Sequence, residues 1–146
     1  MTTQYRSASP AETEALGRRL CEGLIQKGLR RAFVALFGEM GVGKTAFARG
    51  FGAALGISGV KSPTYTVVNE HRGTPVPLFH FDMYRIQDPD DLTSIGYDDY
   101  LMREGYVLCE WSERIEDELP PDAIRVTVAR TDGENGRSIT VQGDFA

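Results

Sequence analysis

Residues 33–46, FVALFGEMGVGKTA, carry the pattern that decides the fold. An apolar run over 33–37 stops at Gly38, and residues 38–45 then match the phosphate-loop pattern G-x-x-x-x-G-K-[ST] at every defined position. In this pattern a buried strand leads into a glycine loop whose backbone N–H groups surround phosphates. The helix that follows points its positive N-terminal end at the same charge. The stretch therefore predicts a nucleotide site in an α/β fold.

The residue types in this loop have predicted roles. Lys44 is expected to reach the β- and γ-phosphates, and the Thr45 hydroxyl is expected to bind Mg²⁺. The residues predicted to contact the nucleotide are Glu39, Met40, Gly41, Val42, Gly43, Lys44, Thr45 and Ala46. The ordinary alternative is a chance glycine turn before a helix, and the strand-loop-helix setting makes that less probable.

A dinucleotide-binding fingerprint is a second alternative, because Gly41-x-Gly43-x-x-Ala46 fits its relaxed form. That fingerprint requires an acidic residue about twenty positions further on, at the end of a strand. Residues 62–64, SPT, occupy that place instead. Lys44 also puts a long cation where a pyrophosphate needs close approach to the backbone, so the pattern favours a phosphate loop.

Length and composition indicate one domain spanning residues 1–146, with little room for a lid. Charged residues make up 25% and hydrophobic residues 41%, which is ordinary for a globular chain, and no apolar run approaches the length of a membrane span. The first ten residues are polar and do not resemble a signal peptide. We therefore expect a cytoplasmic protein that does not contact a membrane.

The cysteines and the net charge exclude further classes of function. Cys21 and Cys109 lack metal-ligand spacing and are predicted to be reduced core residues. With 21 acidic against 16 basic residues the net charge is -5. A protein that binds nucleic acid broadly and alone needs a basic face, so the charge argues against that mode of nucleic-acid binding.

The order of predicted elements supports an α/β fold. A capping box at Ser9-Pro10-Ala11-Glu12 starts an amphipathic helix that ends at Gly28 and precedes the first strand. The further elements, in order, are a helix over 45–55, strands over 65–70 and 76–81, a helical region with Asp88 as its cap and Pro89 at its first position that is interrupted at Gly96 and continues to 104, a strand over 106–109, a short helix from Ser112, and strands over 124–128 and 138–142. We predict a P-loop NTPase fold with a mostly parallel central sheet flanked by helices and an antiparallel C-terminal hairpin.

Two acidic residues follow predicted buried strands. Asp82 comes after Leu78-Phe79-His80-Phe81, and Glu110 comes after Tyr106-Val107-Leu108-Cys109. Carboxylates at this edge of an open α/β sheet commonly bind the magnesium ion of a nucleotide. One of the two should hold Mg²⁺ with Thr45, and the other is available to orient the attacking water.

Other candidates are less specific. Thr64 lies where a switch loop would sense the γ-phosphate through a hydroxyl, although a plain proline turn fits equally well. Trp111 could stack on the base or belong to the core, and His71 and His80 are interpreted as structural. An Asn-Lys-x-Asp stretch for guanine is absent from the sequence, so we expect ATP as the nucleotide.

Four motifs together resemble those of a known family. GEMGVGKT at 38–45, KSPTYT at 61–66, HFDMYR at 80–85 and EWSE at 110–113 have the order and spacing of the TsaE (YjeE) family of bacterial tRNA threonylcarbamoyladenosine biosynthesis ATPases. The resemblance runs from about Ser9 to the terminal hairpin. The phosphate loop is widely shared among proteins, whereas the other three motifs are specific.

The resemblance implies a small ATPase that works with TsaB and TsaD partner proteins in modifying tRNA. Carried over by position, it makes Thr45 and Glu110 the magnesium ligands, Asp82 a catalytic acid, Thr64 a switch residue and Trp111 a neighbour of the nucleotide. The alternatives are a small-molecule P-loop kinase, which would need an acceptor pocket, and a nucleotide-sensing regulator that binds without turnover.

Overall fold

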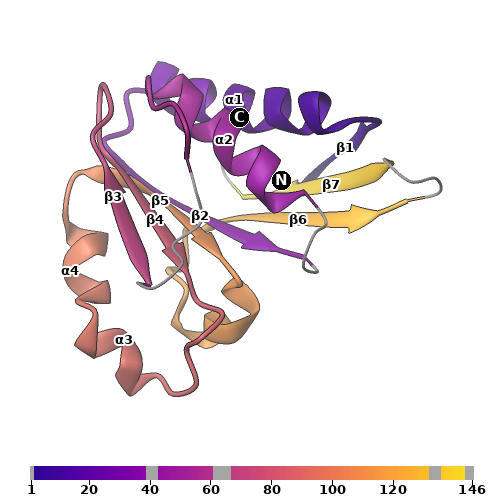
Figure 1. The fold of residues 1–146 in the computed structure, drawn as a ribbon. Coiled ribbons are helices and arrows are strands. Elements are labelled where there is room, and N and C mark those ends of the chain that lie inside the picture. The colour runs from indigo at the N-terminus through magenta and orange to yellow at the C-terminus, as the bar shows by residue number, and fades with distance from the viewer. Residues whose placement is uncertain (1, 39–42, 61–66, 132–135, 144–146) are drawn as a thin grey trace.

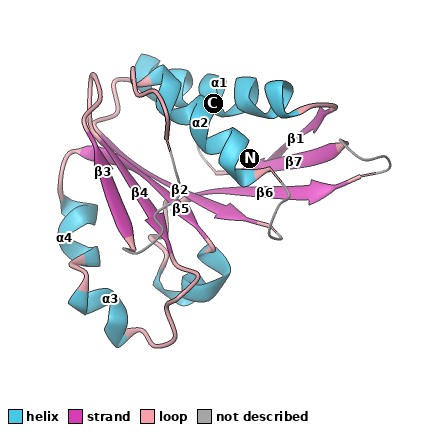
Figure 2. Ribbon diagram, in the orientation of Figure 1, coloured by secondary structure: helices cyan, strands magenta, loops and turns pink. Residues whose placement is uncertain are grey.

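The architecture is a seven-stranded sheet with helices on both faces (Figures 1 and 2). The computed structural model describes residues 2–38, 43–60, 67–131 and 136–143. In chain order, its elements are β1 (Thr2–Ser7), α1 (Pro10–Gln26), β2 (Arg31–Phe37), α2 (Lys44–Ala54), β3 (Val68–His71), β4 (Leu78–Asp82), α3 (Asp90–Ser94), α4 (Tyr97–Met102), β5 (Gly105–Glu110), the 3-10 helix η1 (Ser112–Glu118), β6 (Ile124–Arg130) and β7 (Arg137–Gln142). Within the described ranges, no helix is long and apolar enough to cross a membrane.

The strands are arranged in the order β1-β7-β6-β2-β5-β4-β3. The central pairs β6–β2, β2–β5 and β5–β4 are parallel, whereas the outer pairs β1–β7, β7–β6 and β4–β3 are antiparallel. All six residues of β5 are buried, as expected for a parallel strand covered on both faces. The parallel centre and the β6–β7 hairpin confirm the predicted fold class.

Two apolar cores form, one on each face of the sheet. The first packs α1 and α2 against alternate strand residues such as Val34, Leu36 and Leu78. The second packs α3, α4 and η1 against the residues that point the other way, among them Phe79 and Phe81. Side chains alternate along a strand, so the two cores determine on which face of the sheet each side chain of β4 and β5 lies.

Helix α1 forms as its capping box predicts. Ser9 is the N-cap and its hydroxyl accepts the Glu12 N–H at 3.2 Å, while the Glu12 carboxylate accepts the Ala8 N–H. Leucines at four-residue spacing along the helix are buried, namely Leu16, Leu20 and Leu24. The sequence also predicted correctly that Cys21 and Cys109 are buried and free.

A strand that the sequence analysis missed precedes this helix. Residues 2–7 form β1, which pairs antiparallel with β7 from Thr2 opposite Gln142 to Ser7 opposite Arg137. The prediction that α1 comes before the first strand is therefore wrong. Only alternate residues of β1 are partly or fully covered, so the apolar signal is confined to Tyr5.

The boundaries of several other elements shift by a few residues. Helix α3 begins at Asp90 rather than at Pro89, the predicted first helical position, and the Asp88 side chain accepts the Asp90 N–H at 2.9 Å as the predicted cap would. Helix α4 ends at Met102 rather than 104, because the backbone of Arg103 is already extended, with φ -80° and ψ 150°. The first part of the strand predicted over 65–70 lies outside the described residues, and the described part is β3.

Helices α1 and α2 approach each other at two glycines. A Cβ added at Gly50 would overlap the carbonyl oxygen of Glu14, and one added at Gly17 would overlap the carbonyl oxygen of Phe47. Both clashes are with backbone atoms, which cannot rotate away as a side chain can. The close contact holds α2, the helix that begins at Lys44, in a fixed position over the sheet.

We predict that Gly50→Ala lowers the free energy of unfolding by about 3 kcal/mol, since the added methyl must push the two helices apart. At an ordinary interior position of a helix, the same change would stabilise the protein by about 0.5–1 kcal/mol. A loss of stability in Gly50→Ala, rather than a gain, therefore indicates the close contact. Gly28→Ala is the control, because its Cβ would meet nothing within 4 Å and only the positive φ of 74° is strained, a cost of about 1–2 kcal/mol. Urea unfolding of the parent, Gly50→Ala and Gly28→Ala proteins measures the free energy of unfolding. A Gly50→Ala variant as stable as the parent would contradict the close contact.

Candidate nucleotide site

The site begins at the N-terminus of α2. Gly43 is the N-cap residue with φ 117° and provides no side-chain cap, and no acidic residue occupies the first turn. The first N–H groups of this helix are therefore available to an anion. Lys44, Thr45 and Ala46 form that first turn, with Thr45 exposed and Ala46 buried.

The Lys44 side chain packs against the protein rather than extending into solvent. Its ammonium Nζ donates to the Gly38 carbonyl oxygen at 2.7 Å and lies 4.1 Å from the centroid of the Trp111 ring. The residue is 4% exposed. Burial lowers the pKa of Lys44, and the carboxylates of three neighbours oppose part of that shift, namely Glu113, Glu110 and Asp82. The ammonium thus lies among the acids that the sequence singled out.

Asp82 and Glu110 lie side by side at the ends of adjacent parallel strands. The two residues are opposite each other in the register of β4 and β5. Leu78 and Leu108 belong to the core under α1 and α2, so Asp82 and Glu110, at even spacing from them, present their side chains on the face where α2 begins. The structure therefore brings together the lysine and both acids that the sequence selected.

The Asp82 carboxylate is oriented by its own turn. Its Oδ1 accepts the Tyr84 N–H at 3.0 Å, and the Asp82 N–H donates to the Val67 carbonyl at 2.8 Å. Burial raises the pKa of Asp82, and the Glu110 carboxylate adds to the increase. The Tyr84 N–H, His80 and Lys44 act in the opposite direction.

Two further residues contact the site and were not assigned to it from the sequence. His80 Nε2 lies 2.5 Å from Glu110 Oε2, and both side chains are buried. The Glu113 carboxylate accepts the N–H of Gly38, the first residue of the phosphate loop, at 2.8 Å. Both belong to the HFDMYR and EWSE motifs, so motif membership was the signal that could have identified them.

An aromatic group borders the lysine. Trp111 adopts a left-handed backbone conformation, with φ 58°, which a non-glycine residue adopts at an energetic cost. The centroid of its ring lies 4.9 Å from the centroid of the Tyr84 ring, and the Arg114 guanidinium lies 5.4 Å from the centroid of the Tyr84 ring. Trp111 is partly exposed and Tyr84 is 45% exposed. The aromatic surface formed by Tyr84 and Trp111 thus lies next to Lys44 and faces solvent.

The residues present suit a magnesium nucleotide. Two neighbouring carboxylates supply the oxygen ligands that Mg²⁺ prefers, and a bound cation would relieve the repulsion that contributes to the raised pKa of Asp82. Lys44 and the uncapped start of α2 supply positive charge for phosphates. The remaining predicted contacts, Glu39, Met40, Gly41, Val42 and Thr64, lie outside the described residues.

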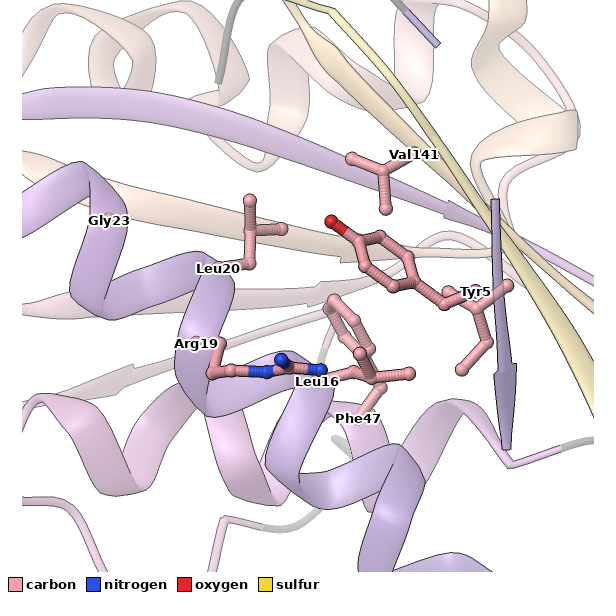
Figure 3. Close-up of a pocket in the computed structure, with 8 residues that line it drawn as sticks. Tyr5, Leu16, Arg19, Leu20, Gly23, Phe47 and Val141 are labelled. Carbon is pink, nitrogen blue, oxygen red and sulfur yellow. The ribbon is translucent and has the colours of Figure 1, made fainter. Parts of the chain in front are cut away.

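A separate cavity of about 140 Å³ lies between α1 and the strands β1 and β7 (Figure 3). The Tyr5 ring points into it toward Leu20 and Val141. It is lined by Tyr5, Leu16, Arg19, Leu20, Gly23, Phe47, Ile139 and Val141. Among the residues that the structure describes, this lining contains one charged side chain, Arg19, and no carboxylate, so they do not offer the chemistry of a magnesium nucleotide site.

Comparison with known proteins identifies the family. The family model described as threonylcarbamoyl adenosine biosynthesis protein TsaE matches residues 7–139. The chain belongs to the TsaE family. The matched range includes Lys44, Asp82 and Glu110, and it confirms the resemblance drawn from the four motifs.

Individual TsaE proteins match over most of their length. The tRNA threonylcarbamoyladenosine biosynthesis protein TsaE of Bacillus subtilis is 35% identical over 138 residues, which are 94% of this chain and 83% of that protein. The protein of the same name from Haemophilus influenzae is 39% identical over 114 residues, covering 77% and 72% of the two chains. The crystal structure of Bacillus subtilis YdiB superposes with a TM-score of 0.80 at 29% identity and covers 98% of this chain and 86% of its own. The fold of YdiB thus extends over nearly the whole chain.

Proposed function

We propose that this protein binds and hydrolyses ATP with Mg²⁺ in the biosynthesis of threonylcarbamoyladenosine in tRNA, together with TsaB- and TsaD-like partner proteins. The observation that carries the proposal is the register pair of Asp82 and Glu110 beside the buried Lys44 at the start of α2. Family membership supports the biosynthetic role, because the relatives from B. subtilis and H. influenzae are named for it.

Each residue has a distinct part in the proposed reaction. Lys44 moves its ammonium from the Gly38 carbonyl to the β- and γ-phosphates and neutralises their charge. Thr45 and Glu110 would hold Mg²⁺, which when bound neutralises phosphate charge and orients the terminal phosphoryl group. Asp82, fixed by the Tyr84 N–H, orients the attacking water. Thr64 is proposed to distinguish ATP from ADP through its hydroxyl.

The surface around the site supports a role for partners. The aromatic surface of Tyr84 and Trp111 is exposed next to Lys44, and a bound protein would exclude water there. The net charge of -5 disfavours tRNA binding by this chain alone, since phosphate contacts supply most non-specific affinity for nucleic acid. We therefore assign tRNA recognition to the partners.

The first expected result is a fluorescence change on ATP binding. Trp111 is the only tryptophan of the chain and its ring is in contact with the Lys44 ammonium, so withdrawal of that ammonium by phosphate must alter the environment of the indole. We expect a saturable change with ATP and Mg²⁺, slow phosphate release by the protein alone, and faster release when TsaB and TsaD are added. A Lys44→Met variant, which retains the apolar stem, is the matched control and should give no change with ATP.

The same assays separate the alternative functions. A small-molecule kinase would consume ATP only when a metabolite with a hydroxyl acceptor is supplied. A nucleotide-sensing regulator would show the fluorescence change without phosphate release under any condition. Tight tRNA binding by the isolated chain at physiological salt, or phosphate release indifferent to TsaB and TsaD, would contradict the assigned dependence on partners.

A further inference from the structure

A buried histidine contacts one of the two site carboxylates. His80 lies on β4 two residues before Asp82, so both present their side chains on the face where α2 begins. Its Nε2 lies 2.5 Å from Glu110 Oε2, and the two side chains are 1% and 7% exposed. A hydrogen bond between two buried side chains restricts the rotamer of each.

The other nitrogen of the imidazole indicates what this contact is for. His80 Nδ1 is buried and has no hydrogen-bond partner in the described part of the chain. A histidine that served only the core would gain more by satisfying both nitrogens or by being replaced with an apolar residue. Among the described residues, the His80 side chain instead makes its hydrogen bond to the Glu110 carboxylate.

We infer that His80 is a positioning residue, whose Nε2–H donates to Glu110 Oε2 and holds that carboxylate in the orientation in which it binds the magnesium ion of the nucleotide. Hydrogen bonds of this kind commonly fix metal-binding carboxylates, and their loss weakens metal affinity about 10–100-fold. The inference rests on the proposed function, because it requires Glu110 to be a magnesium ligand.

The test measures metal affinity rather than turnover. A non-hydrolysable ATP analogue is bound to the protein, and Mg²⁺ affinity is measured by isothermal titration of Mg²⁺ into that complex. We expect His80→Phe, which keeps the ring volume and lacks the donor, to weaken Mg²⁺ affinity about 10–100-fold. Affinity for the analogue in EDTA should stay unchanged, because the histidine contacts the carboxylate and not Lys44. His80→Leu is a second apolar variant in case the phenylalanine does not fit.

Two controls separate positioning from a general effect on the sheet. His80→Gln keeps an N–H donor at similar reach and should recover most of the Mg²⁺ affinity. His71, on the neighbouring strand β3, also has a buried ring nitrogen without a partner in the described residues, and His71→Phe should bind Mg²⁺ as the parent does. Equal losses in His71→Phe and His80→Phe would overturn the inference.

The Glu110→Gln variant distinguishes failure of the inference from failure of the proposed function. If Glu110→Gln leaves Mg²⁺ affinity unchanged, Glu110 is not a ligand and both assignments fall. If Glu110→Gln weakens Mg²⁺ binding and His80→Phe does not, only the positioning role is overturned. Support requires that both single variants lose affinity and that the double variant loses no more than Glu110→Gln alone, because the histidine then acts through the carboxylate.

Discussion

Replacing Lys44 with alanine is expected to lower ATP affinity about 10–100-fold, because a charge-assisted contact to phosphate contributes about 1.5–3 kcal/mol. The loss of ATP hydrolysis should be larger, about 10²–10³-fold, since charge develops on the phosphoryl oxygens as the bond breaks. Isothermal titration with ATP and Mg²⁺ and a steady-state phosphate assay with TsaB and TsaD present measure the two effects.

Lys44 is also a packing residue, so the variant needs controls for folding. The stem is buried and the ammonium lies over Trp111, and Lys44→Met preserves more of this packing than alanine does. Lys27→Ala removes an exposed lysine just after α1 and should bind ATP as the parent does. A folded Lys44→Met protein with normal ATP affinity and turnover would refute the phosphate-loop assignment.

The second large effect concerns the two acids at the strand ends. Asp82→Ala and Glu110→Ala should each slow ATP hydrolysis about 10²–10³-fold while changing ATP affinity only a few-fold. The carboxylates place the metal and the attacking water, and these contacts strengthen mainly in the transition state. Single-turnover hydrolysis and equilibrium ATP binding, measured on the same preparations, separate the two quantities.

Asp99→Ala is the control for this pair, because Asp99 is an exposed acid on α4. It should leave both hydrolysis and binding unchanged. Turnover at the parental rate in either Asp82→Ala or Glu110→Ala would remove that residue from the site. Equal losses in hydrolysis and in ATP affinity would instead mean that the acids contribute to ground-state binding.

The parts of the fold that could be predicted are those with a local signal. Residues 33–46 contain the strand, the glycine loop and the helix start in one stretch, and β2 and α2 form where that stretch places them. Asp82 and Glu110 were found because each directly follows a buried apolar run. Parallel strands then place their ends at the same edge of the sheet, so the pairing of the two acids follows from topology without knowledge of any contact.

The parts that could not be predicted depend on contacts distant in sequence. His80 meets Glu110 across 30 residues and Glu113 meets Gly38 across 75, and neither partner is indicated by the residues around it. From the sequence alone, His80 is interpreted as a core histidine within an apolar strand. Strand β1 was missed because its pairing partner β7 supplies its hydrogen bonds, while its own polar residues carry almost no hydrophobic alternation.

The pairing of β1 with β7 can form only after both strands have been synthesised. The positions of Ser7 and its partner Arg137 differ by 130 residues, so β1 leaves the ribosome on the order of ten seconds before β7 at ordinary rates of translation. Pairing between such distant segments is also slow to nucleate. This edge of the sheet can therefore be completed only after β7 has been made. Residues 2–4, TTQ, are polar, so the unpaired β1 segment lacks the continuous apolar run that promotes aggregation.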